Sequence, residues 1–175
     1  MGILLKTILL LFGVSVLSCY QGHGLSPADS GSTQSGIRGR ITFIGAWPDS
    51  TKEVRMAVLR QYPKGITNRD SMLAFVLVNL VAYSDTLPRF VPEFDYRMPL
   101  EPGTYAWVLT AWFPETPTYI MDVKELGAYY RNPGRQEIPT PVDVLPGVMV
   151  DGINIVADFG NLRRDVPFFK TGRHQ

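Results

Sequence analysis

Histidine and cysteine, two residue types that often act in covalent catalysis, are scarce in this 175-residue chain. A serine or cysteine nucleophile needs a neighbouring base, most often histidine, and a third group that orients that base. The chain has two histidines, His23 in a polar stretch near the N-terminus and His174 one residue from the C-terminus. Polar linkers and chain ends are poor places for a pre-organised site. We therefore predict no catalytic residues and no enzymatic activity.

Paired carboxylates could do acid–base work, as they do in glycosidases, if two of them faced one cleft. Asp151 and Asp158 are seven residues apart in a strand-like region, and so point to opposite faces. Asp122 and Glu125 are three residues apart near a predicted helical turn. We expect all four to be solvated loop acids or turn caps.

Metal and cofactor sites are not indicated by any motif. The sequence has neither the metal-binding spacing of histidines and cysteines nor a glycine-rich phosphate loop. Loop carboxylates can bind calcium, but here they follow no recognised calcium-loop pattern. The loop carboxylates that could be considered for calcium are Asp49, Asp143 and Asp151. We therefore predict no metal and no cofactor.

The single cysteine, Cys19, stands where a thiol can have a specific covalent role. It follows an uncharged stretch, residues 7–17, that is too short to span a bilayer and is typical of an export signal. The residues before it, Val16-Leu17-Ser18, resemble the lipobox of bacterial lipoproteins. This resemblance implies cleavage between Ser18 and Cys19 and attachment of lipid to the thiol. The alternatives are an ordinary signal peptide followed by a chance cysteine, or an uncleaved anchor.

The lipoprotein resemblance also implies where the protein would reside. Acyl chains on Cys19 would give stable membrane attachment, at about 0.8 kcal/mol per buried methylene. Tyr20 occupies the place where an aspartate often signals retention in the inner membrane of enterobacteria. In a Gram-negative cell we therefore expect the outer membrane. The segment 20–26 lacks the acidic cluster used for surface export in some Bacteroidetes, which favours a position facing the periplasm.

Composition divides the chain into a signal (1–18), a lipidated cysteine with a flexible tether (19–36), a folded domain (37–162) and a C-terminal tail (163–175). Glycine, serine and small polar residues dominate the tether. Hydrophobic residues make up 45% of the chain and charged residues 19%, as in ordinary globular proteins. The formal net charge is +1, and Lys6 in the signal supplies it, so the remainder is neutral and no nucleic-acid partner is expected.

Alternation of apolar and polar residues predicts half-buried strands over 37–43, 54–58, 94–100 and 153–159. Residues 104–113 are apolar on both faces, which indicates a central strand, and 128–131 and 141–145 suggest two short ones. Turn residues such as Pro102-Gly103 separate the strands. Seven strands at this spacing predict a mainly-β fold, an antiparallel seven-stranded β-sandwich that is transthyretin-like or immunoglobulin-like.

One apolar stretch, residues 70–81, does not alternate. We predict a short helix over 70–78, capped by Asp70, running into a strand over 81–84. The β-branched and aromatic content of the stretch suits a buried strand equally well. The side chains of this stretch that we expect to face the hydrophobic core of the domain are Leu73, Phe75, Val76 and Leu80.

Three segments resemble the transthyretin-like family, which includes the carboxypeptidase regulatory-like domains. They are the opening Ile37-Arg38-Gly39-Arg40-Ile41, the element Leu100-Glu101-Pro102-Gly103-Thr104-Tyr105, and the closing strand 152–159. The resemblance implies a β-sandwich and no shared catalytic residues. The apolar segment 68–91 departs from the family pattern, so the family predicts no strand order there.

Aromatic residues exceed what strand alternation can bury. Exposed aromatics on a sandwich form surfaces for protein or sugar partners, whereas the alternative is that most of these rings, like Trp107, belong to the core. We expect a non-catalytic binding or structural module of the bacterial cell envelope with a protein partner, or alternatively a carbohydrate-binding module. The candidate binding residues are Trp47, Trp112, Tyr119, Tyr129 and Tyr130.

Overall fold

The computed structural model describes residues 34–66, 68–117, 122–132 and 138–161. All of these belong to the second of two compact units, Thr33–Gln175. The first unit, Met1–Ser32, lies outside the described residues, and with it the predicted signal, Ser18, Cys19 and nearly all of the tether.

The first sheet is built around β1 (Gly36–Ile44). β4 (Glu93–Pro99) pairs with β1 in antiparallel register, with Gly39 opposite Tyr96. On its other side β1 pairs in parallel with β10 (Ile155–Asp158) and, near its start, with β9 (Met149–Val150). The polar residues of β1 are exposed while Ile37, Ile41 and Phe43 are buried, as the alternation predicted.

The second sheet has the order β3 (Leu80–Tyr83), β2 (Thr51–Leu59), β6 (Trp107–Pro114) and β7 (Lys124–Ala128), and every pair in it is antiparallel. β6 lies between β2 and β7 and is buried on both faces, which explains its unbroken apolar sequence. A two-stranded sheet of β5 (Gly103–Tyr105) and β8 (Val142–Val144) lies beside them. Here the buried Tyr105 hydroxyl donates to the carbonyl oxygen of Glu101, 2.6 Å away.

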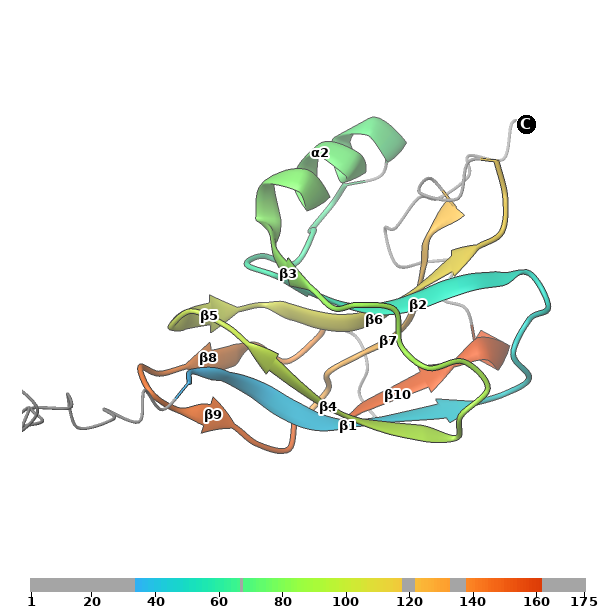
Figure 1. Ribbon diagram of the computed structural model, residues 1–175. Coiled ribbons are helices and arrows are strands. Elements are labelled where there is room, and N and C mark those ends of the chain that lie inside the picture. Colours follow the sequence, from blue (N-terminus) through green and yellow to red (C-terminus); the bar gives the residue numbers. More distant parts are fainter. Residues whose placement is uncertain (1–33, 67, 118–121, 133–137, 162–175) are drawn as a thin grey trace, which may run out of the picture. The chain divides into compact units, whose positions relative to one another are not determined.

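The main hydrophobic core lies between the two large sheets (Figure 1). At one side β7 approaches β10 so closely that a Cβ added to Gly127 would lie 2.0 Å from the carbonyl oxygen of Val156. The prediction of a mainly-β sandwich is therefore confirmed. The described residues form ten strands, several of them only two to four residues long, where the sequence indicated seven. The largest fully buried side chains of the main core include Tyr105, Ile37, Ile41, Met56 and Ile155.

The apolar stretch forms a helix, α2 (Arg69–Asn79), that continues directly into β3, so the predicted helix is confirmed. Its cap is Asn68 rather than Asp70, because the Asn68 side-chain oxygen accepts the N–H of Ser71 at 2.8 Å. Met72 is the helix residue that is fully buried, while Leu77 is 69% exposed. Among the described residues no helix is both long enough and apolar enough to cross a membrane.

A second, smaller core covers the outer face of the second sheet. It contains Trp107, Leu109 and Val123, and partly buried residues of α2 pack against it. β7 starts four residues before the strand predicted at 128–131. The reason is that a buried charged residue, Glu125, and a register shift between Thr110 and Ala111 break the alternation there. A short 3-10 helix, η2 (Phe159–Asn161), follows β10.

Candidate functional site

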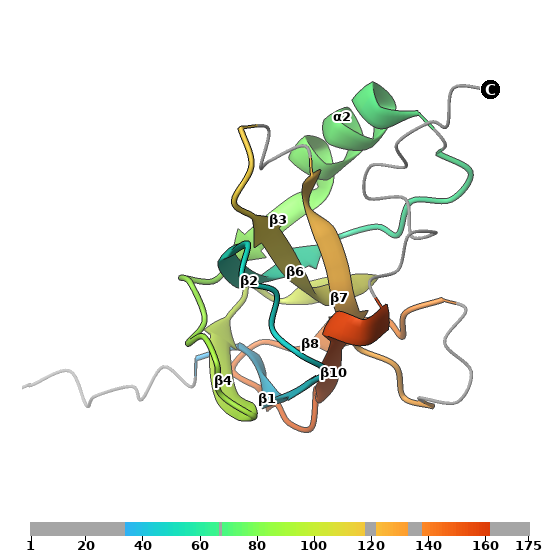
Figure 2. The same ribbon diagram turned by 90° about the vertical axis from the view of Figure 1, so that its right-hand side faces the viewer.

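Four aromatic rings meet at the end of the sandwich where β1 stops, and we call them the aromatic tip: Phe43, Trp47, Phe90 and Phe159. The ring of Trp47 lies at its centre. Its centroid is 4.5 Å from that of Phe159, 4.9 Å from Phe43 and 5.6 Å from Phe90. The four residues come from β1, the β1–β2 loop, the β3–β4 loop and η2, and Figure 2 looks onto this end of the domain.

Short hydrogen bonds hold the loops of the aromatic tip in place. The Phe43 N–H donates to the carbonyl oxygen of Pro92 at 2.8 Å, which ties the β3–β4 loop to β1. In the β1–β2 loop, the backbone N–H and the hydroxyl of Thr51 both donate to the carbonyl oxygen of Pro48. Gly45 has a φ of 79°, and a Cβ there would lie 2.8 Å from the backbone nitrogen of Gly160. Only glycine fits both requirements at that position.

Exposure rises steeply across the aromatic tip. Phe43 and Phe159 are buried and Trp47 is half-buried, whereas the Phe90 side chain is 67% exposed. Phe90 also has a φ of 61°, and it is the one described non-glycine residue with a positive φ. A bulky side chain in the left-handed region is uncommon and costs about 1–2 kcal/mol. Such strain is found at functional sites, where the surrounding structure enforces it.

Arg89 adds a cation to the exposed part of the tip. Its guanidinium carbon lies 5.9 Å from the centroid of the Phe90 ring. One guanidinium nitrogen donates to the carbonyl oxygen of Thr51 at 3.0 Å, which fixes the side chain against the edge of the sandwich. The tip therefore presents an exposed ring, a half-buried indole and an anchored cation together.

The aromatic tip lies at the far end of β1 from Gln34, the first described residue (Figure 1). The start of β1 pairs with Pro99 and Met149, and its last residue, Ile44, pairs with Asp158 next to η2. Nine residues of strand separate the two ends, or about 30 Å. The described part of the chain thus begins at the end of the domain opposite the tip.

The other aromatic candidates do not join Trp47. Trp112 is 6% exposed and its indole N–H donates to the Thr51 hydroxyl at 3.0 Å, so its ring offers no surface to a partner. Tyr129 packs against the main core and Tyr130 against the smaller one. Tyr119 lies outside the described residues, as do Ser18 and Cys19.

Sequence analysis missed Phe90. The ring is flanked by Pro88 and Pro92, and a large aromatic held in a loop between two prolines is a signal that strand alternation does not detect. Because the composition of this segment is typical of a turn, the sequence does not indicate whether the Phe90 side chain is buried or exposed.

Five of the six carboxylates considered for chemistry have hydrogen-bond or ion-pair partners, the exception in this count being Asp49. Asp151 forms an ion pair with Arg38, and Asp143 accepts the Thr104 hydroxyl at 2.7 Å. Glu125 is fully buried and accepts the indole N–H of Trp107 at 3.1 Å. In the part of the chain that the structure describes, no group of three or more histidine, cysteine or acidic residues could hold a metal ion.

Strain at Phe90 can be measured by comparing two substitutions that both delete its ring. Phe90→Gly relieves the left-handed backbone, whereas Phe90→Ala keeps a Cβ there. We expect the glycine variant to be more stable than the alanine variant by about 1 kcal/mol, measured by urea unfolding. At the neighbouring Arg89, whose φ is not positive, the order should reverse. Equal stability of Phe90→Gly and Phe90→Ala would show that the backbone is not strained.

The chain was compared with known proteins at the level of families, sequences and structures. No family model matches it, and searches of the curated proteins and of the solved structures found no match. The sandwich fold therefore rests on the structure itself, and the resemblances to lipoproteins and to the transthyretin-like family stay predictions.

Proposed function

We propose that this chain is a lipid-anchored, non-catalytic binding module of the bacterial cell envelope that holds a protein partner at the aromatic tip. One observation carries the proposal: a mostly exposed phenylalanine, Phe90, stands on a strained backbone at the end of the domain opposite Gln34. Strain and an exposed ring both reduce the stability of the isolated domain. A partner that covers the ring recovers part of that free energy.

The chemistry of the aromatic tip favours a protein over a sugar. Aromatic residues and arginine are enriched among the residues that dominate protein–protein binding, and Trp47, Phe90 and Arg89 are of these types. The rings of Trp47 and Phe90 are tilted by 50° to each other. They therefore do not form one plane on which a sugar ring can stack.

The anchor part of the proposal is supported by the sequence around Cys19, which resembles a lipobox. A tether of Gly- and Ser-rich composition spans about 20–25 Å on average over some seventeen residues. Attachment of this kind keeps a binding module near a membrane while leaving it free to rotate. The proposed location is the outer membrane, facing the periplasm, in a Gram-negative cell.

A photo-reactive phenylalanine analogue at position 90, introduced in the natural host, tests the protein partner. Because Phe90 is 67% exposed, the analogue should be accommodated without loss of packing. We expect a cross-linked product of defined mass that contains a second protein, detected by electrophoresis and mass spectrometry.

Leu145 provides the matched control, because its side chain is also exposed, at 60%. It lies at the opposite end of β1, in the turn before Val148, and the carbonyl oxygen of Val148 accepts the N–H of Gly36. The analogue at position 145 should yield no such product. Adducts of equal amount at both positions, or adducts with glycan alone, would contradict a protein partner at the aromatic tip.

Replacement of Cys19 by serine tests the anchor separately. Without the thiol no thioether lipid can form, so Cys19→Ser protein should leave the membrane fraction or accumulate unprocessed, as judged by fractionation and intact mass. Wild-type amounts of mature Cys19→Ser protein in the membrane would rule out the lipid anchor. This result would not affect the proposal that the aromatic tip binds a protein.

A further inference from the structure

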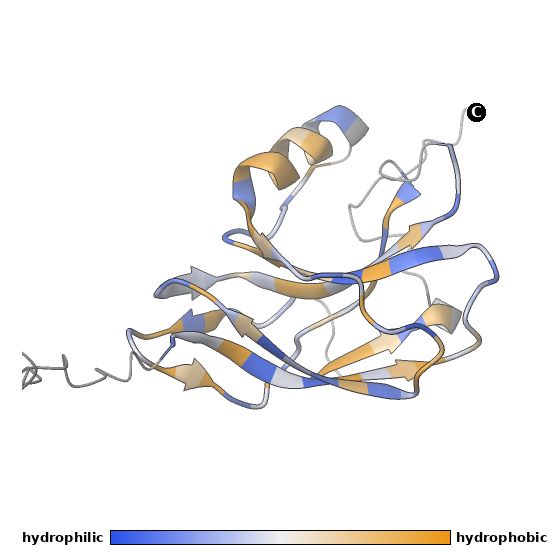
Figure 3. Ribbon diagram, viewed as in Figure 1, coloured by the Kyte–Doolittle hydropathy of each residue, from blue (hydrophilic) through white to orange (hydrophobic). Residues whose placement is uncertain are grey.

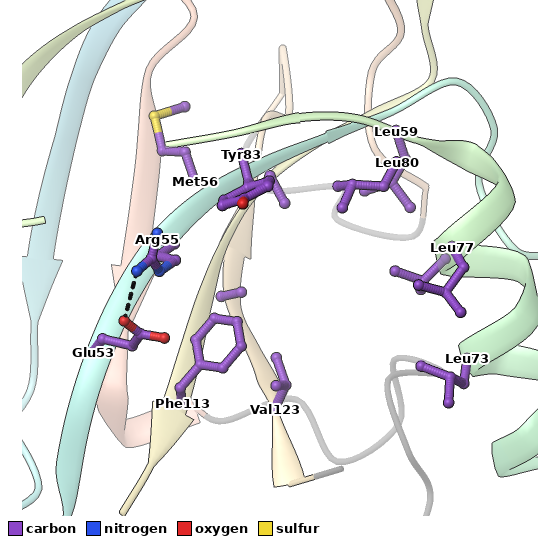
Figure 4. A pocket seen from close by; sticks show the side chains of 13 residues that line it. Glu53, Arg55, Met56, Leu59, Leu73, Leu77, Leu80, Tyr83, Phe113 and Val123 are labelled. Atoms are coloured by element: carbon purple, nitrogen blue, oxygen red, sulfur yellow. Dashed lines mark hydrogen bonds and ion pairs between the residues drawn. The ribbon is translucent and has the colours of Figure 1, made fainter. Parts of the chain in front are cut away.

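A groove of about 520 Å³ lies between α2 and the outer face of the second sheet, away from the aromatic tip. In Figure 4, Leu73 and Leu77 of α2 point across an open space toward Phe113 of β6 and toward Val123. The helix is hydrophobic over most of its length (Figure 3), yet its inner face is only partly covered by the sheet. Apolar side chains on both walls are therefore left accessible to a ligand.

The groove offers almost no hydrogen-bonding groups. Apart from Glu53, Arg55 and the hydroxyl of Tyr83, its lining side chains are aliphatic or phenylalanine. Its floor is formed mainly by β2 and β6, which pair with each other along their length and with β3 and β7 over part of it, so most of their backbone groups are used within the sheet. An extended peptide lying over this floor would lose water from its own N–H and C=O groups and gain few partners, which is unfavourable. A hydrocarbon chain needs no hydrogen bonds, so it can lie among the apolar side chains of the groove without leaving polar groups of its own unpaired.

The polar end of the groove is electrically neutral. An Arg55 guanidinium nitrogen lies 2.9 Å from a carboxylate oxygen of Glu53, and the Thr86 hydroxyl donates to the same oxygen at 3.0 Å. The hydrogen bond from Arg55 holds the pKa of Glu53 below its usual range, so both groups are charged at neutral pH and compensate each other. Arg55 also donates to the carbonyl oxygen of Ser84. A free carboxylate head would meet Glu53 as well as Arg55, whereas an uncharged head with hydroxyl or ester oxygens would suit the pair.

We propose that this groove binds the acyl chain of an uncharged, ester-linked lipid, with the hydrocarbon between α2 and the sheet and the head group beside the Glu53–Arg55 pair. The match in charge, the apolar lining and the scarcity of backbone partners favour this ligand class. This site is distinct from the aromatic tip and does not depend on the function proposed for it.

The test uses the full chain and 1-palmitoylglycerol that carries a photo-reactive diazirine in its acyl chain. After irradiation, mass spectrometry should place the label on peptides that contain Leu73, Leu77 or Phe113. Leu77→Asp puts a charge on the groove wall and should lower this labelling about tenfold or more. Val78→Asp is the matched control, because Val78 is the next helix residue, is 81% exposed and does not line the groove. Its labelling should stay at the wild-type level.

Competition with the wild-type protein keeps the test independent of how the variants fold. Unlabelled 1-palmitoylglycerol should displace the probe, whereas palmitate, which has a free carboxylate, should displace it much less. Equal displacement by the two would overturn the assignment of an uncharged head group. Labelling spread over the surface, or unchanged in Leu77→Asp, would overturn the site. Phe90→Ala should leave the labelling unchanged, because Phe90 does not line the groove. A negative result for lipid binding in the groove can therefore be distinguished from a negative result for protein binding at the aromatic tip.

Discussion

The candidate site depends on the packing of the Trp47 ring against the other rings of the aromatic tip. It packs against rings from β1, from η2 and from the β3–β4 loop, three segments that are distant in the sequence. The Trp47–Phe90 pair contributes about 0.5–1.5 kcal/mol beyond its buried area, which offsets part of the roughly 1–2 kcal/mol cost of the left-handed backbone at Phe90. Trp47 thus stabilises the loop that carries Phe90, together with the hydrogen bonds from Phe43 to Pro92 and from Arg89 to Thr51.

The groove has a different physical origin. The second sheet is apolar on both faces, because β6 lies in its centre and packs against the main core on one side and the smaller core on the other. The outer face must be covered, and α2 provides the cover while joined to the sheet directly through β3. Phe75 of the helix packs against the smaller core, while the Leu73 and Leu77 side chains reach toward the sheet without filling the space. Between this cover and the sheet lies a cleft whose walls are mainly hydrophobic.

Much of the fold was predictable from local patterns. Alternation identified β1, β2 and β4, since their residues take turns between core and solvent, and the double-sided apolar run identified the central position of β6. The helix followed from an apolar run that does not alternate, but its cap was misplaced because Asn68 and Asp70 are equally good cap residues. β7 was shifted because a buried acid, Glu125, breaks the expected pattern. The site was less predictable. Trp47 was identified by residue type, whereas Phe90 and the groove arise from contacts between loops and layers that no local pattern encodes.

The central claim is that the aromatic tip is covered by a protein in the cell. Hydroxyl-radical footprinting measures this directly, because oxidation of a side chain reports its access to solvent. We expect Phe90 to be oxidised far less in intact cells than in the purified protein, while Leu145, which is exposed at the opposite end of β1, is oxidised equally in both. Equal oxidation of Phe90 in the two preparations would contradict the account.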